Sequence, residues 1–235
     1  MGQAYFITGT GTDIGKTIVT SALYLSLQTL GKSVTIFKPF QTGINEENHT
    51  YPDISWFEQE LGVKESGFYT LEPETSPHLA IKLTGSLIDE KKVVERVHEL
   101  EEMYDIVLVE GAGGLAVPLI ERTEGFYMTA DFIRDCGMPV LFVSTSGLGA
   151  IHDVVTTHSY AQVHDINVKT ILYNHYRAED RIHQDNIETI EKLTGLNGLA
   201  CIPTLADVRK DLRICILDLL GDQEYTQQLK EVFEA

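Results

Sequence analysis

The sequence predicts an α/β fold in which one parallel sheet is covered by helices on both faces. Two observations support this prediction: short apolar runs bounded by turn residues recur along the chain, and segments with helical periodicity lie between them. Continuous apolar runs are typical of strands that are buried on both faces. Repeated strand–helix units place successive strands parallel, because a helical crossover returns the chain to the same end of the sheet.

Each element follows from its own segment. The expected strands are Ala4 to Ile7, Ser33 to Phe37, Asp105 to Val109, Pro139 to Val143, Lys169 to Tyr173 and Leu199 to Ile202. The expected helices are Lys16 to Leu30, Asp53 to Leu61, Asp89 to Met103, Met128 to Asp135, Ile151 to Val163, Ala178 to Leu193 and a tail from Leu212. Gly43 to Pro52 and Gly67 to His78 are polar and irregular, and we predict long loops with a functional role there.

Length and charge limit the classes of function. A chain of 235 residues with 43% apolar residues is expected to form a single domain over residues 1–235. Its 18 basic and 35 acidic residues give a formal net charge of -17, which repels nucleic acid and anionic membranes. The sequence shows no secretion signal and no apolar stretch of the roughly 20 residues that a membrane span requires. We therefore expect a soluble, cytoplasmic protein with no nucleic acid or membrane partner.

The segment Phe6 to Ala22, FITGTGTDIGKTIVTSA, joins the first predicted strand to the first helix through a glycine-rich turn. Backbone N–H groups of such a turn surround phosphates, Lys16 reaches the terminal phosphates, and the Thr17 hydroxyl binds Mg²⁺. The spacing is G-x5-G-K-T, because the glycine of the general pattern is replaced by Thr10 and stands at Gly9 instead. The segment predicts a P-loop that binds a nucleoside triphosphate.

Two other interpretations of this loop explain less. A dinucleotide-binding G-x-G-x-x-G from Gly9 would place its third glycine at Ile14, and Lys38 replaces the acidic ribose ligand expected after the second strand. A glycine turn that only lets strand meet helix does not account for a lysine at the helix start.

Charged residues that follow the second and third strands are expected to meet at the carboxyl edge of the sheet. Lys38 should face the phosphates. Glu110 is a strand-end carboxylate suited to Mg²⁺, and the glycines after it let the backbone approach a ligand. A salt bridge from Glu110 to a lysine without metal, and a solvated strand end for Lys38, are the alternatives. Asp53 is either a helix N-cap or a ligand on spacing alone.

Five motifs together resemble those of the dethiobiotin synthetase family, in the same order and spacing. They are GTGTDIGKT, KPFQTG, TSPH at Thr75 to His78, VEGAGG and IPTLAD at Ile202 to Asp207. The resemblance covers essentially the whole chain, and the longer P-loop agrees with it. It implies an ATP-dependent cyclo-ligase that forms a carbamate from CO2 and 7,8-diaminononanoate, phosphorylates it to a carbamic-phosphoric anhydride, and closes the ring of dethiobiotin with release of ADP and phosphate.

The resemblance also implies roles for individual residues. The implied catalytic residues are Lys38, which would stabilise the carbamate as it attacks phosphorus, together with Lys16 and Thr12. The implied Mg²⁺ ligands are Thr17, Asp53 and Glu110. The implied ATP-binding residues are Gly11, Thr12, Asp13, Ile14, Gly15, Lys16, Thr17, Glu110, Gly111, Asn174, Pro203 and Leu205. The implied substrate residues are Lys38, Thr42, Gly113, Gly114, Leu148, Gly149, Ala150 and Ile151.

The segment Ser146 to Asp153, SGLGAIHD, follows the fourth strand and opens the helix from Ile151. Its free N–H groups and the helix dipole form an anion site, unless the helix start only meets water. In the resembling family this segment binds the substrate's carboxylate tail across a two-fold interface. The resemblance therefore implies a homodimer with shared active sites.

Two other classes share parts of the pattern. A P-loop ATPase switch of the partitioning type would carry a second, signature lysine at the position of Gly11, and the charge of -17 disfavours the basic surface that such proteins need. A P-loop amide ligase of cofactor synthesis would need a glutaminase portion that 235 residues are too short to carry. ATP turnover that depends on diaminononanoate and bicarbonate distinguishes the enzyme from the switch.

Three remaining features are interpreted structurally. The cysteines lack CxxC spacing and are interpreted as reduced core thiols: Cys136, Cys201 and Cys215. Three histidines recur every six residues, which is not one helical face, so we expect surface positions rather than a metal site for His152, His158 and His164. The acidic run from Glu95 to Glu102 is predicted to be a solvated helix face.

Overall fold

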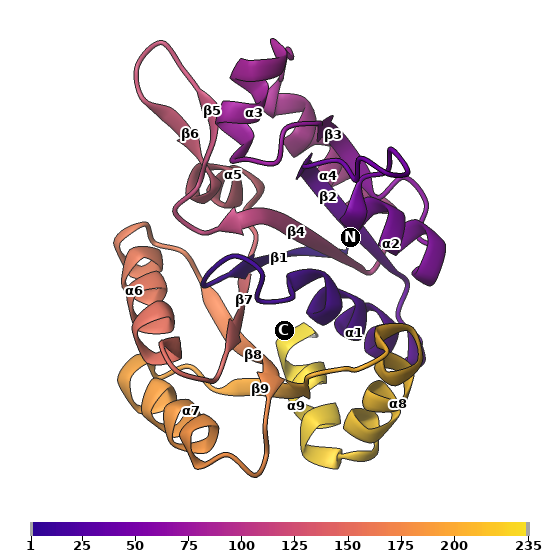
Figure 1. Cartoon of the computed structure of the whole chain (residues 1–235), viewed down its shortest axis with the longest axis vertical. Helices are drawn as coiled ribbons and strands as arrows, with labels where there is room; N and C mark the ends of the chain where they lie inside the picture. Colours follow the sequence, from indigo (N-terminus) through magenta and orange to yellow (C-terminus); the bar gives the residue numbers. More distant parts are fainter. Residues whose placement is uncertain (1, 234–235) are drawn as a thin grey trace.

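The computed structural model describes residues 2–233, in which a seven-stranded parallel sheet has the order β3-β2-β4-β1-β7-β8-β9 (Figure 1). The strands are β1 (Gln3–Gly9), β2 (Val34–Thr42), β3 (Gly67–Leu71), β4 (Ile106–Gly114), β7 (Val140–Thr145), β8 (Val168–Tyr176) and β9 (Gly198–Pro203). Every adjacent pair is parallel. The predicted fold class is confirmed, and β1 at the centre of the sheet leads directly into the P-loop.

Helices cover both faces of the sheet. One face packs against α1 (Lys16–Thr29), α2 (Pro52–Leu61), α8 (Val208–Gly221) and α9 (Gln223–Phe233), and the other against α4 (Glu90–Met103), α5 (Thr129–Cys136), α6 (Ala150–Val163) and α7 (Arg181–Thr194). Successive residues of β1 enter different layers: Phe6 packs with α5, and Ile7 belongs to the cluster on the α1 side. Strands buried on both faces are therefore apolar throughout, as their sequences indicated.

Gly67 to Leu71 form the edge strand β3, so the prediction of a loop over Gly67 to His78 was wrong for this part. β3 pairs with β2, and alternate side chains of β3 are exposed. The propensity of a short half-exposed strand is weak, and pairing with β2 decides its conformation. Gly43 to Pro52 is irregular as predicted, apart from an isolated bridge between Asn45 and Thr50.

Four other features depart from the prediction. Helix α3 (Pro77–Thr84) and the antiparallel hairpin β5 (Pro118–Glu121) and β6 (Phe126–Met128) were not predicted; they pack on each other through His78 and Phe126, whose rings lie 5.5 Å apart. The C-terminal tail begins before Leu212 and is divided at Asp222 into α8 and α9. Asp180 accepts from Ile182 N, so α7 begins at Arg181 rather than at Ala178.

The prediction of a solvated helix face from Glu95 to Glu102 was wrong at Glu101. Glu101 is buried because the end of α4 lies against the start of β1, where Glu101 Oε1 accepts from Ala4 N at 2.8 Å and Oε2 lies 2.9 Å from His98 Nδ1. The cysteines are free thiols, with Cys136 and Cys215 buried and Cys201 partly buried, and burial raises the pKa of Cys201 to about 11.

His152 is exposed, whereas His158 and His164 are partly buried along and just after α6. Within residues 2–233 no helix has both the length and the apolar character to cross a bilayer.

Candidate active site

The P-loop connects β1 to α1 at the carboxyl edge of the sheet. Its last residue, Gly15, has φ +82°, and a Cβ there would lie 2.1 Å from Asn174 Nδ2. Asn174, on β8, donates from Nδ2 to Ile14 O at 2.9 Å, so a hydrogen bond from β8 restrains the P-loop. Since Gly15 has no side chain to cap α1 and the first turn holds no acidic residue, the N–H groups of this helix start can receive an anion.

The altered glycine spacing has a packing explanation. A Cβ at Gly9 would lie 2.6 Å from Gly11 O and 2.7 Å from Ile14 Cδ1, so the loop folds tightly over this position. Thr10, which stands where the general pattern has glycine, is hydrogen-bonded to β7. Its N donates to Val143 O at 3.0 Å, and its hydroxyl donates to Ser144 Oγ at 2.9 Å.

Lys38, Asp53 and Glu110 meet beside the P-loop, although they come from β2, α2 and β4. Lys38 Nζ lies 2.7 Å from Asp53 Oδ2 and 2.7 Å from Glu110 Oε1. Lys38 is 3% exposed and Glu110 is fully buried, so the solvated strand end that was an alternative for Lys38 is wrong. A buried cation held between two carboxylates is costly unless all its partners are in place, and here they are.

Two hydroxyl groups of α1 complete this cluster. Thr17 Oγ1 lies 2.9 Å from Asp53 Oδ1 and 3.2 Å from Glu110 Oε1. Thr20 Oγ1, one turn further along, donates to Glu110 Oε2 at 2.6 Å. The sequence analysis did not identify Thr20; its spacing of three residues from Thr17, on the same helix face, was the available signal.

Charge and burial shift the pKa values of the cluster. Burial alone would lower the pKa of Lys38, but Glu110 and Asp53 outweigh it and raise this pKa above its ordinary value. Burial would raise the pKa of Asp53, but Lys38 and the Thr17 hydrogen bond lower it below its ordinary value. Burial lowers the pKa of Lys16, the charge of Lys38 lowers it further, and nearby carboxylates oppose part of this shift.

A cavity of about 470 Å³ opens over this cluster, lined by predicted residues from four segments: Thr12, Asp13, Lys16, Lys38, Thr42, Asp53 and Gly113. It also contains side chains that the sequence analysis did not single out, among them Gln41 and Glu74. Close packing explains the glycines at positions 111 and 114. A Cβ at Gly111 would lie 2.7 Å from Phe6 Cζ, and a Cβ at Gly114 would lie 3.3 Å from Gly9 O.

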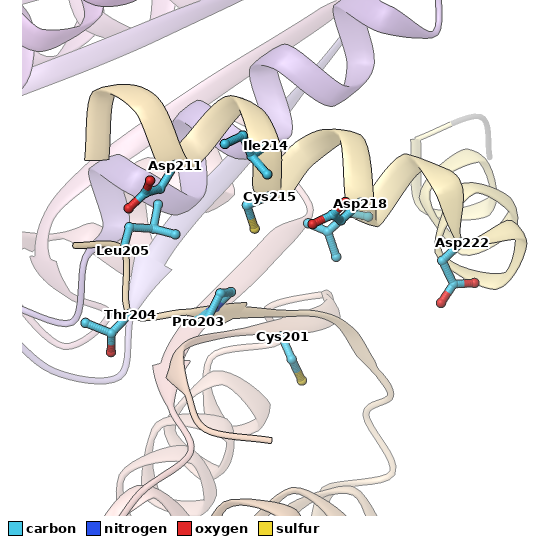
Figure 2. Close-up of a pocket in the computed structure, with 10 residues that line it drawn as sticks. Cys201, Pro203, Thr204, Leu205, Asp211, Ile214, Cys215, Asp218 and Asp222 are labelled. Atoms are coloured by element: carbon cyan, nitrogen blue, oxygen red, sulfur yellow. The ribbon is translucent and has the colours of Figure 1, made fainter. Parts of the chain in front are cut away.

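Pro203 and Leu205 line a second cavity, of about 510 Å³, between the end of β9 and α8 (Figure 2). Figure 2 shows Cys215 and Asp218 on α8 above the segment that carries Cys201 and Pro203. This segment contacts the strand beside the P-loop, because Thr204 Oγ1 lies 3.3 Å from His175 Nδ1. Pro203 and Leu205, which the family resemblance implied as ATP-binding residues, are therefore adjacent to the loop through β8 rather than in one cavity with it.

Leu148, Gly149 and Ile151 line a third cavity, of about 470 Å³, between α6 and α7. Leu148 is 98% exposed, Ala150 is buried, and Gly149 is the N-cap of α6 with φ +95°. Among residues 2–233, the residues that line this cavity and those that line the cavity over Lys38 have none in common. Within one chain the predicted substrate residues thus fall into two separate groups.

Fold and site together define a protein of the P-loop NTPase class. Solved structures support the fold: the MinC:MinD cell division protein complex of Aquifex aeolicus has a TM-score of 0.63 at 15% identity, over 100% of this chain and 97% of that one. The septum site-determining protein MinD of Pyrococcus horikoshii, complexed with Mg-ADP, has a TM-score of 0.58 at 17% identity, over 99% of this chain and 96% of that one.

Sequence relatives are much more similar. The family model described as an AAA domain matches residues 3–211. ATP-dependent dethiobiotin synthetase BioD of Geobacillus sp. (strain WCH70) is 49% identical over 234 residues, 99% of this chain and 98% of the relative. The protein of the same name from Geobacillus kaustophilus is 47% identical with the same coverage, and that of Staphylococcus epidermidis is 40% identical over 80% of this chain and 85% of the relative. The chain belongs to the ATP-dependent dethiobiotin synthetase family.

Proposed function

We propose that this chain, acting as one domain over residues 1–235, carries out the family's ATP-dependent ring closure of 7,8-diaminononanoate with CO2. The product is dethiobiotin, with ADP and phosphate. The observation that carries the proposal is the position of Lys38: a buried ammonium group beside a P-loop cavity, held at 2.7 Å by two carboxylates from different elements.

The oxygen atoms of Thr17, Asp53 and Glu110 fit Mg²⁺. They are hard ligands, and Asp53 Oδ1 and Glu110 Oε1 lie 2.9 Å and 3.2 Å from Thr17 Oγ1, at the start of α1, where the phosphates would be received. Among residues 2–233 no group of three or more His, Cys, Asp or Glu side chains is placed to hold a metal, so phosphate and water oxygens would complete the shell. Bound Mg²⁺ would neutralise charge on the β- and γ-phosphates.

Lys16 and Lys38 have different roles in the proposed reaction. Lys16 lines the cavity at the helix start and neutralises the terminal phosphates. Lys38 stabilises the carbamate oxygen as it attacks the γ-phosphorus, while the hydroxyls of Thr12 and Thr42 lie in the same cavity to orient the carbamate. The second amine then attacks the carbonyl carbon of the mixed anhydride, and phosphate leaves.

We infer that ATP lies along residues 11–17, with its terminal phosphates toward Glu110 and Gly111 and its base toward Asn174, Pro203 and Leu205. The separation of the Lys38 cavity from the α6 segment supports a homodimer, in which residues 148–151 receive the carboxylate tail of a substrate bound over the partner's P-loop. A cytoplasmic location accords with this biosynthetic role.

The test is ADP release from ATP with diaminononanoate and bicarbonate, with dethiobiotin detected by mass spectrometry. Turnover should require both substrates and be supported by Mg²⁺ or Mn²⁺ but not by Zn²⁺, because the ligands are oxygen atoms. ATP hydrolysis that is indifferent to the diamine would favour the ATPase switch, whose fold this chain shares.

A further inference from the structure

Two buried side chains of α7 hold the loop of residues 146–149, which joins β7 to α6. His183 Nδ1 lies 2.7 Å from Ser146 Oγ. Asn186 Nδ2 donates to Ser146 O at 2.9 Å and to Gly147 O at 2.7 Å. His183 is 3% exposed, and Ser146 is fully buried. Two successive carbonyls and one hydroxyl of this loop are therefore restrained from a neighbouring helix.

The partners of His183 indicate which tautomer its ring adopts. Arg177 Nε can only donate, and it donates to His183 Nε2 at 3.2 Å, so the ring proton of neutral His183 is on Nδ1 and points to Ser146 Oγ. Arg177 is held in turn by Asp180, whose Oδ2 lies 3.3 Å from Arg177 Nη2. Hydrogen-bond donation thus runs in one direction from Arg177 through His183 to Ser146 in the loop.

The same loop borders a cavity that suits an aliphatic chain. Aliphatic side chains from both helices line it, including Leu148, Ile151 and Val155 of the loop and α6 and Leu193 of α7. Asn186 is also part of this lining. The loop ends at Gly149, the N-cap of α6, so its backbone sets the direction of the first free N–H groups.

We propose that His183 and Asn186 are positioning residues that fix residues 146–149 for an aliphatic carboxylate and thereby set the preference for a diamine with a carboxylate tail. This inference rests on the proposed function, in which the loop receives that tail. His183 acts through Ser146, and Asn186 acts through the carbonyls of residues 146 and 147.

The test compares two vicinal diamines, 7,8-diaminononanoate and 2,3-diaminooctane, which lacks the carboxylate. His183→Leu and Asn186→Leu should raise the KM for diaminononanoate about tenfold, as expected when an anion loses an aligned helix N-terminus. The KM for 2,3-diaminooctane and the Kd for ATP should not change. His183→Asn keeps a donor near Nδ1 and should restore most of the preference. Asp185→Ala, an exposed position of the same helix, is the matched control.

Equal losses with both diamines would overturn the inference, because they would indicate a general structural role. An unchanged preference in His183→Leu and Asn186→Leu would overturn it as well. Wild-type protein that does not turn over diaminononanoate would reject the proposed function and the inference together, whereas turnover with an unaltered preference rejects the inference alone. If His183→Leu fails to fold, His183→Gln, which loses the Nδ1 donor, takes its place under the same criteria.

Discussion

Thr20 Oγ1 donates to Glu110 Oε2 at 2.6 Å, and both residues are fully buried. This hydrogen bond fixes the rotation of the carboxyl group, so that Oε1 faces Lys38 and Thr17. The carboxylate of Glu110, within β4, is thereby oriented by a helix that begins at the P-loop, which links the P-loop directly to the cluster of Lys38, Asp53 and Glu110.

Removing this hydroxyl should weaken metal binding. Thr20→Val keeps the shape but leaves Glu110 Oε2 without its donor, which costs roughly 1–3 kcal/mol for a buried group. We expect a higher Mg²⁺ concentration at half-maximal activity, and weaker Mn²⁺ binding measured by electron paramagnetic resonance. Thr20→Ser should behave as wild type, and Thr29→Val, at the exposed end of α1, is the control. An unchanged metal requirement would show that Thr20 does not orient Glu110.

Lys38→Met should separate catalysis from nucleotide binding. ATP should still bind, whereas dethiobiotin formation should fall by about 10²-fold or more through loss of a transition-state charge contact. The variant also leaves the carboxylates of Asp53 and Glu110 without the cation between them. Mg²⁺ should therefore raise the Tm of the variant more than that of wild type, as differential scanning fluorimetry can show. Near-normal turnover would contradict the catalytic role.

Lys16→Ala should abolish ATP binding measured by calorimetry, because the terminal phosphates lose the cation at the start of α1. The fold should persist, since Lys16 is already destabilised as a cation by its burial and by Lys38, which lower its pKa. Circular dichroism is the control for folding. Retained ATP affinity would place the phosphates elsewhere.

Asp53 predicts an acid-dependent loss of stability. Its folded-state pKa lies below the ordinary value of 3.8, so its contribution is present above pH 3.8 and is lost as the pH falls through the folded-state pKa. In metal-free urea denaturation, the stability difference between wild type and Asp53→Asn should be large at about pH 6 and shrink as the pH falls below 3.8 toward the lower folded-state pKa. A difference that does not depend on pH would argue against the ion pair with Lys38.

The proposed sharing of active sites between two subunits predicts complementation. Gly149→Asp places a negative charge at the N-terminus of α6, against the substrate carboxylate. Gly149→Asn is the control, because it also puts a side chain at a position with φ +95° but adds no charge. Mixed dimers of Gly149→Asp with Lys38→Met chains should regain activity that neither homodimer has, because one site then has two intact halves. Mixed dimers that form but remain inactive would reject binding across the interface.

The sequence by itself determined the parallel sheet, the P-loop and the placement of Lys38 and Glu110 on two strands beside it. The predicted strand ends were wrong, because β2 continues to Thr42 and β4 to Gly114, so both residues lie within their strands. These features depend on local patterns: apolar runs buried on both faces, glycines in a tight turn, and charged residues that follow an apolar run. The edge strand β3 and Glu101 were mispredicted because pairing with β2 and packing against β1 decide them.

Only the tertiary structure decided how distant side chains combine. Asp53 could be a cap or a ligand on spacing alone, and its contacts with Lys38 and Thr17 depend on how α2 packs beside α1. The role of Thr20 depends in the same way on the distance between α1 and β4, and that of His183 on how α7 lies under the loop of residues 146–149. Such hydrogen bonds join residues 36 to 90 positions apart, so no local pattern records them; packing of the buried core brings their partners within reach.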